Sequence, residues 1–231
     1  MRHIFASLLC LFLLAFAFSA SADAQGTNKP APGPAPGIVR VRLVTSEGPI
    51  ILALDARRAP KTTGNFMTYV DDGRFDDTQF YRAARRKTDP KLGFIQGGVG
   101  TDARRTLPAI PHEPTTQTGI QHLDATISMA RNAPGTAMGN FFLTVGSTPN
   151  MDAAGAYPGY AAFGHVVAGM DTVRRILAMP TGGGEGAMRG QKLLKPVRLI
   201  RAERIDGKAR PSSPIKPWLM KTLRKDMKPR K

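Results

Sequence analysis

Hydrophobic and charged residues alternate where the folded part of the chain is expected to begin. In residues 38–44 (IVRVRLV), apolar side chains recur at every second position, which is the period of a half-buried β-strand. Residues 46–48 (SEG) form a turn sequence, and residues 49–54 (PIILAL) predict a second strand. The pattern therefore predicts an antiparallel hairpin near the start of the domain.

Two other segments have the features of helices. Pro60 suits the first turn of a helix, which we expect to extend to about residue 70 and to end at residues 71–73 (DDG). In residues 170–178, apolar side chains recur at i, i+3 and i+7, and Pro180 would stop that helix.

Short strand-like segments separated by Gly and Pro make up much of the chain up to residue 206. They are residues 79–82, 93–96, 126–130, 141–145, 161–167 and 197–205. Many short strands with two helices predict a mainly β fold, a closed antiparallel barrel capped at its ends. The glycine-rich residues 181–190 (TGGGEGAMRG) lack a preceding strand and a lysine partner, so we expect a surface loop there.

Both ends of the chain are expected to lie outside this domain, which we place at residues 38–206. Residues 1–24 have a short basic start, an apolar run and an A-x-A cleavage site, and predict a signal peptide. Retention as an uncleaved anchor is the less favoured alternative, because the apolar run is short for a membrane span. Residues 25–37 (QGTNKPAPGPAPG) predict an extended linker, and residues 207–231 a basic tail.

The tail carries much of the positive charge. The chain has a formal net charge of +16, and residues 208–231 hold nine Lys or Arg against one acid, Asp226. Residues 217–227 (PWLMKTLRKDM) predict a short basic amphipathic helix. A solvated or self-docking tail, an anionic membrane surface and acidic proteins all remain open as explanations, whereas nucleic acid is not expected for an exported protein.

The usual catalytic motifs are missing from the sequence. Cys10, the only cysteine, falls within the signal peptide, which excludes thiol chemistry from the mature protein. No G-x-S-x-G, H-E-x-x-H or phosphate-binding GK[ST] motif occurs. We expect His112, His122 and His165 to be surface or hydrogen-bonded residues, and we expect neither a metal site nor a cofactor.

Six strings in one order carry a family resemblance that spans nearly all of residues 38–206. They are APKTTGNFMTY (59–69), FYR (80–82), FIQGG (94–98), ISMAR (127–131), GNFFLTV (139–145) and FGHVVAGMDTV (163–173). In this order and spacing the chain resembles the cyclophilins, in particular the bacterial exported ones. The resemblance implies an eight-stranded barrel with two helices and peptidyl-prolyl cis-trans isomerase activity without a cofactor.

The chemistry of that reaction needs no nucleophile, acid or metal. Amide resonance opposes rotation with a barrier of about 18–20 kcal/mol, although cis and trans X-Pro bonds differ little in energy. An enzyme must therefore favour the twisted amide, in which the nitrogen lone pair is localised. An apolar cup for the proline ring and a fixed hydrogen-bond donor to that nitrogen would do so.

The resemblance assigns roles to ten residues. Arg82 corresponds to the donor to the amide nitrogen, Gln96 to the amide that binds a substrate carbonyl, and Phe142 to the base of the proline pocket. The expected substrate-binding residues are Phe94, Met129, Ala130, Arg131, Asn140, Met151 and Tyr160.

Three departures from the family pattern concern the rim of the pocket. Asn140 replaces the usual glutamine and is one methylene shorter, while Asn150 and Met151 occupy the place of an aromatic–leucine pair. Between Arg82 and Phe94 the link AARRKTDPKLG is longer and more basic than the usual one, which leaves the register of Phe94 open.

The leading hypothesis is an isomerase that acts on proline-containing segments of exported proteins in the periplasm. A proline-binding scaffold or holdase with little catalysis is the alternative, because the rim is altered. A third hypothesis gives priority to the tail, which would deliver the barrel, expected to be a monomer, to an anionic membrane surface. Secretion from the cell is a separate alternative to a periplasmic location.

Overall fold

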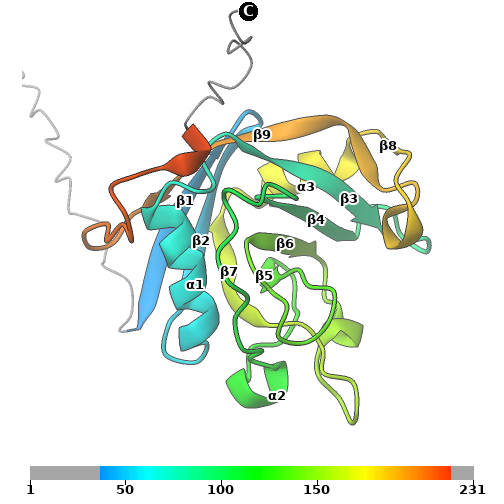
Figure 1. Ribbon diagram of the computed structural model, residues 1–231. Coiled ribbons are helices and arrows are strands. Elements are labelled where there is room, and N and C mark those ends of the chain that lie inside the picture. Colours follow the sequence, from blue (N-terminus) through cyan, green and yellow to red (C-terminus); the bar gives the residue numbers. More distant parts are fainter. Residues whose placement is uncertain (1–36, 220–231) are drawn as a thin grey trace, which may run out of the picture. The chain divides into compact units, whose positions relative to one another are not determined.

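Eight strands form a closed antiparallel barrel, as the sequence predicts (Figure 1). The computed structural model describes residues 37–219, so the expected signal peptide, nearly all of the linker and residues 220–231 lie outside it. The strands are β1 (Ile38–Thr45), β2 (Gly48–Asp55), β3 (Thr78–Arg85), β4 (Gly93–Gly98), β5 (Thr126–Met129), β6 (Asn140–Val145), β7 (Ala162–Ala168), β8 (Thr181–Gly182) and β9 (Lys192–Arg204).

The order of the strands is β1-β2-β7-β5-β6-β4-β3-β9, and pairing of β1 with β9 closes the ring. Within β1, Val41 and Leu43 are fully buried and Arg42 between them is exposed, which confirms the alternation read from the sequence. The two-residue strand β8 joins the edge of β9 and is not part of the ring.

The two expected helices are α1 (Pro60–Asp71) and α3 (Met170–Ala178), with Pro60 in the first turn of α1. A four-residue helix, α2 (Thr115–Thr118), was not predicted because it is too short to show a period. Glu113, which precedes α2, accepts hydrogen bonds from the backbone N–H groups of Lys61 and Thr62, at 3.1 and 2.7 Å. The carboxylate of the sequence HEP thus caps α1 from a distant loop.

Aromatic side chains from α1 and the barrel form the centre of the core. The ring of Phe66 on α1 lies 4.9, 5.3 and 5.4 Å from those of Phe75, Phe141 and Phe163, centroid to centroid. All four side chains are almost completely buried. Contacts of this kind add about 0.5–1.5 kcal/mol per pair to the burial of the rings.

The segment that follows β9 packs against the C-terminal end of α1, and we call this region the tail dock. The Asp71 carboxylate pairs with Arg204 and accepts a hydrogen bond from the Arg210 backbone N–H. The Asp72 carboxylate pairs with Arg74 at 2.7 Å and accepts hydrogen bonds from the backbone N–H and the hydroxyl of Ser212, at 2.6 and 2.7 Å. The buried indole of Trp218 completes the dock, with the Arg74 guanidinium 4.5 Å from its ring centroid.

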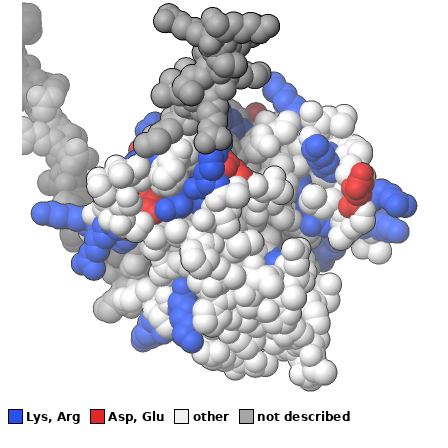
Figure 2. Space-filling view, in the orientation of Figure 1, with Lys and Arg blue, Asp and Glu red and all other residues white. Residues whose placement is uncertain are grey.

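The residues expected to form the amphipathic helix are described only at their start, where Pro217–Leu219 forms a short 3-10 turn, η3. Figure 1 shows the segment that follows β9, drawn in orange to red, beside α1. On the face drawn in Figure 2, Lys and Arg side chains clearly outnumber Asp and Glu. Within residues 37–219, no helix has the length and apolar character needed to cross a membrane.

Candidate active site

A β-bulge in β3 determines which way Arg82 points. Phe80 pairs with Gly97 of β4, and Arg82 pairs with Gln96, so Tyr81 has no partner in the ladder. In a regular strand Phe80 and Arg82 would share a face, and Phe80 is in the core. The extra residue inverts the alternation and turns Arg82 to the outer face of the barrel.

Strand register then aligns the expected catalytic residues in one row across four strands. Arg82 on β3 pairs with Gln96 on β4, which pairs with Phe142 on β6, which pairs with Ser128 on β5. Because paired residues share a face of a sheet, the row brings together all three residues expected to be catalytic. We call the outer surface around this row the active face.

The Arg82 guanidinium is held by three neutral acceptors. Nη1 donates to Gln96 Oε1 at 2.9 Å, Nε to Gln191 Oε1 at 2.8 Å, and Nη2 to the Ala187 carbonyl at 2.8 Å. Its central carbon lies 5.0 Å from the ring centroid of Phe94. Burial lowers the pKa of Arg82 from its ordinary value, although Tyr81 and Tyr160 oppose the shift, so the charge is partly stripped of water.

Phe142 lies at the base of an aromatic group on the active face. Its ring centroid is 5.3 Å from that of Phe94 and 5.5 Å from that of Tyr160, and the Tyr160 ring meets it edge-on. The neighbouring Phe141 points into the core instead, as the period of two requires. This arrangement settles the register of Phe94, which contacts both Arg82 and Phe142.

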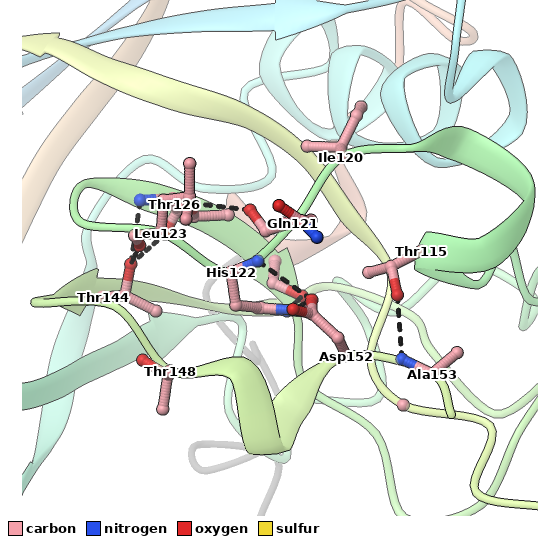
Figure 3. A network of polar contacts seen from close by, with 12 residues as sticks. Thr115, Ile120, Gln121, His122, Leu123, Thr126, Thr144, Thr148, Asp152 and Ala153 are labelled. Carbon is pink, nitrogen blue, oxygen red and sulfur yellow. Dashed lines mark hydrogen bonds and ion pairs between the residues drawn. The ribbon is translucent and has the colours of Figure 1, made fainter. Parts of the chain in front are cut away.

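His122 supports Phe142 from below. The two rings stack with centroids 5.9 Å apart and planes within 11°. His122 Nδ1 lies 2.6 Å from Asp152 Oδ1 (Figure 3). His122 Nε2 lies 2.9 Å from Ser128 Oγ. A carboxylate only accepts, so Nδ1 carries the proton and Nε2 accepts from the Ser128 hydroxyl.

The order Ser128–His122–Asp152 is that of a hydrolytic triad, but it is inaccessible. The side chains of Ser128 and His122 are completely buried, so no substrate can reach the hydroxyl. Burial, opposed by Asp152, lowers the pKa of His122 below its usual value and keeps the ring neutral at pH 7. The group is a support for the pocket floor.

The remaining expected residues lie in three places. Asn140 exchanges two hydrogen bonds with the Gly100 backbone, at 2.8 and 3.0 Å, so this shorter side chain is committed within the chain. The Arg131 guanidinium donates to the Gly159 carbonyl and lies 4.7 Å from the Tyr160 ring centroid. The Tyr160 N–H donates to the Met151 carbonyl at 2.9 Å, which joins both residues at the rim.

Met129 and Ala130 stand apart from the row of Arg82. Met129 pairs with Phe141 and belongs to the hydrophobic core, so the register places it on the inner side of the sheet and not in the outer wall of the pocket. Ala130 follows β5, is half-buried, and donates its N–H to the Asn140 carbonyl at 2.9 Å. This hydrogen bond places Ala130 beside Asn140, the first residue of β6, at the edge of the active face.

Residues that hold Arg82 and Gln96, and those that support Phe142, were missed from sequence. The Tyr81 hydroxyl accepts a hydrogen bond from Gln96 Nε2 at 2.8 Å, and Gln191 and Ala187 hold Arg82. The glycine-rich residues 181–190, expected as a surface loop, thus supply a contact to the site and also contain β8. The only sign of the bulge in the string FYR is that Phe80 is apolar and Arg82 is charged, although residues two apart share a face in a regular strand. His122 carries no local signal.

Comparison with known proteins supports the same assignment. Residues 40–204 match the family described as cyclophilin type peptidyl-prolyl cis-trans isomerase/CLD. The chain is 35% identical over 151 residues to peptidyl-prolyl cis-trans isomerase cyp18 of Streptomyces antibioticus, covering 63% of this chain and 87% of the relative. It is 34% identical over 142 residues to peptidyl-prolyl cis-trans isomerase A of Dickeya dadantii, covering 61% and 72%.

Solved structures show the same fold at lower identity. A cyclophilin type peptidyl-prolyl cis-trans isomerase of Cryptosporidium parvum aligns with a TM-score of 0.59 and 20% identity, over 74% of this chain and 99% of that one. Since the family match extends from β1 to β9, the chain belongs to the cyclophilin-type peptidyl-prolyl cis-trans isomerases, and the prediction of an isomerase of this class is confirmed.

Proposed function

We propose that the chain accelerates cis–trans exchange of X-Pro bonds in exported proteins, with Arg82 as the donor to the amide nitrogen of the twisted bond. The observation that carries the proposal is the bulge at Tyr81, which turns Arg82 onto the same outer row as Gln96 and Phe142. A proline ring placed against Phe94 and Phe142 would have its amide nitrogen close to this guanidinium.

Two effects would lower the barrier. The aromatic floor removes water from the proline ring and disfavours the charge-separated resonance form of the amide. Arg82 donates to the nitrogen lone pair, which accepts a hydrogen bond only when the bond is twisted. A charge-assisted hydrogen bond contributes about 1.5–3 kcal/mol, which corresponds to roughly 10- to 150-fold in rate.

Gln96 has two parts in this proposal. Its Oε1 holds Arg82 Nη1, and Tyr81 fixes the amide by accepting from Nε2. An amide nitrogen has two hydrogens, so the second can donate to a substrate carbonyl. The neighbouring Gln191 holds Arg82 Nε, so the guanidinium is oriented before substrate binds, which reduces the ordering needed during the reaction.

The test is NMR exchange spectroscopy on a short Ala-Pro peptide, which observes cis–trans exchange without a coupled protease. We expect Arg82→Ala to lower kcat/KM by roughly 10- to 150-fold, and Arg82→Lys to fall between, because a lysine keeps the charge but not the fork of donors. Arg42→Ala is the matched control, since this half-exposed arginine of β1 pairs with Glu203 away from the row. Equal rates for wild type and Arg82→Ala would refute the donor role.

The scaffold hypothesis predicts a different result. If peptide binds, as chemical-shift changes at the active face would show, but exchange is not accelerated by the wild-type protein, the chain is a proline-binding scaffold or holdase. The oriented, partly desolvated guanidinium favours catalysis, because binding alone does not require a donor aimed at the amide nitrogen.

We also propose that the protein works in the periplasm after removal of residues 1–24. The apolar run and A-x-A site support this proposal. Recovery of the mature protein from the periplasmic fraction with Gln25 at its N-terminus is the expected result, and a full-length cytoplasmic protein would contradict it.

An anionic membrane surface remains a proposed partner of the basic tail. Removal of residues 220–231 alone would test it, because this truncation retains Ser212 and Trp218 of the tail dock. We expect binding to vesicles that contain anionic lipid to fall while isomerisation is retained.

A further inference from the structure

Two departures from the family pattern meet in one cavity. The basic link that follows Arg82 and the rim residues Asn150 and Met151 are far apart in the sequence. Together with Phe94 they line a cavity of about 440 Å³ that borders the active face. Both departures thus contribute to one cavity, which shares Arg82 and Phe94 with the active face and extends beyond them to Arg86 and Ser147.

Arginine dominates the polar lining of this cavity. Arg82, Arg85 and Arg86 all border it. Ala84 pairs with Phe94 on the row next to Arg82, so Arg82, Ala84 and Arg86 follow the alternation on the outer side of β3 and its extension. The small Ala84 between them leaves space for a ligand.

These three guanidiniums bond to neutral oxygens. Arg86 Nη2 donates to the Ser147 carbonyl and lies 3.4 Å from Thr148 Oγ1. Arg85 donates to the Leu177 and Met179 carbonyls at 2.9 and 2.8 Å. None of the ion pairs found among residues 37–219 includes Arg82, Arg85 or Arg86.

Among residues 37–219, no Asp or Glu lines this cavity, so its three guanidiniums are expected to give it a positive potential. Low-dielectric walls such as Phe94 and Met151 strengthen this potential inside a cleft. Arg86 is the cation best placed to meet a ligand. Its side-chain hydrogen bonds within residues 37–219 all come from Nη2, whereas Arg85 donates through both Nη1 and Nη2 and Arg82 is needed at the amide nitrogen.

We propose that this cavity is a subsite for a carboxylate side chain of the substrate peptide, two to four residues from the proline. The proposal rests on the isomerase function stated above. Four residues of strand separate Arg82 from Arg86, about 13 Å at 3.3 Å per residue. An extended peptide covers that distance in about four residues. Because the Arg86 side chain and the carboxylate side chain of the substrate also span part of it, fewer peptide residues are needed.

The test compares Glu and Gln in otherwise identical peptides. Each peptide has one Ala-Pro bond, an acetylated N-terminus and an amidated C-terminus, with the variable residue placed one to five positions from proline on either side. Exchange spectroscopy gives kcat/KM for each peptide. We expect Glu to exceed Gln by roughly fivefold at positions two to four on one side, and by less elsewhere, since a half-exposed ion pair is modest in energy.

Variants identify the cation. Arg86→Gln should reduce the Glu/Gln ratio to near one, and Arg86→Lys should retain most of it, which separates loss of charge from damage to the fold. Lys87→Gln is the matched control, because it removes the same charge from an exposed neighbour that does not line the cavity. The wild-type ratio should also fall as salt is raised from 50 to about 500 mM, since screening weakens exposed ion pairs.

The outcomes separate the two proposals. If both peptides exchange rapidly but the Glu/Gln ratio is one at all positions, the subsite is refuted while the isomerase function stands. A ratio that Lys87→Gln lowers as much as Arg86→Gln would also refute the subsite, because only general surface charge would then be involved. If no peptide exchanges faster than it does alone, the isomerase function itself fails.

Discussion

Arg74 and Arg204 at the tail dock are each paired with a carboxylate, whereas Arg82 and Arg86 on the active face bond to neutral oxygens. The Arg74–Asp72 and Arg204–Asp71 contacts measure 2.7 and 2.6 Å, and both aspartates are almost completely buried. On the active face, carbonyl, amide and hydroxyl oxygens fix the guanidiniums without cancelling their charge.

The difference separates a structural use of arginine from a functional one. In a buried ion pair, each charge is neutralised by the other. Removal of one member therefore leaves an uncompensated charge in the protein. A guanidinium held by neutral dipoles keeps both its orientation and its field for a ligand. Variants at the tail dock should therefore lower stability more than activity. Variants at Arg82 or Arg86 on the active face should lower activity more than stability.

The largest effect on stability is expected for Asp72→Ala. This change leaves Arg74 without its counter-ion and removes both hydrogen bonds to Ser212. We expect the free energy of unfolding, measured by urea denaturation, to fall by about 3 kcal/mol. Exchange of a neutral Ala-Pro peptide should be unchanged. Asp171→Ala, at an exposed carboxylate of α3, is the control and should cost less than about 0.5 kcal/mol.

A smaller loss is expected for Trp218→Ala. The indole is 6% exposed and covers the Arg74 guanidinium, although it belongs to a segment outside the matched family region. Removing it from the edge of the domain should cost about 2 kcal/mol, less than the 3–5 kcal/mol typical of a central aromatic residue. A stability equal to that of wild type would show that the tail dock contributes nothing to the fold.

Arg85→Gln should have a smaller effect again, of about 1 kcal/mol. Arg85 donates to the Leu177 and Met179 carbonyls at the C-terminal end of α3, where a cation also interacts favourably with the helix dipole. Thermal unfolding would measure the loss. A loss of about 3 kcal/mol would make Arg85 as structural as Asp72 and would weaken the contrast between the two regions.

The two regions should respond to acid in different pH ranges. Burial alone would raise the pKa of Asp72, but the hydrogen bonds from Arg74 and Ser212 together outweigh it and lower that pKa. The contribution of Asp72 to stability is therefore complete above about pH 4, the unfolded value, and is lost as pH falls through the folded value. Burial lowers the pKa of His122, so the free energy of unfolding should decline as pH falls below about 6.5, the unfolded value.

A pH series of urea denaturation curves would separate these contributions. His122→Gln should reduce the slope of stability against pH between pH 7 and 5, while His165, whose pKa burial also lowers, retains part of it. An unchanged slope in His122→Gln would show that His122 is not the group that titrates. Asp72→Asn should lower the free energy of unfolding above about pH 4, and the two curves should converge as pH falls below that value, because the contribution of the Asp72 carboxylate is then lost in wild type as well.

The sequence predicted the barrel well because alternation in β1 and helix spacing in α3 are local signals. Residues such as Arg82 and Phe142 could be assigned from collinear strings, and register then explains why they meet. The bulge at Tyr81, the contact from Ala187 and the support by His122 depend on pairings between distant segments. Met129 could not be placed because a pocket wall and a core position have the same apolar signature.

Closure of the barrel has a consequence for how the chain acquires its fold. Val41 of β1 pairs with Arg204 of β9, so a chain synthesised from its N-terminus cannot complete the ring until nearly the whole domain has emerged. Until then β1 has an unpaired edge, which is a site for aggregation. Arg40 and Arg42 lie on this strand, and charged side chains on an open edge oppose pairing with other chains. The two arginines would therefore protect the nascent protein during the interval before β9 arrives.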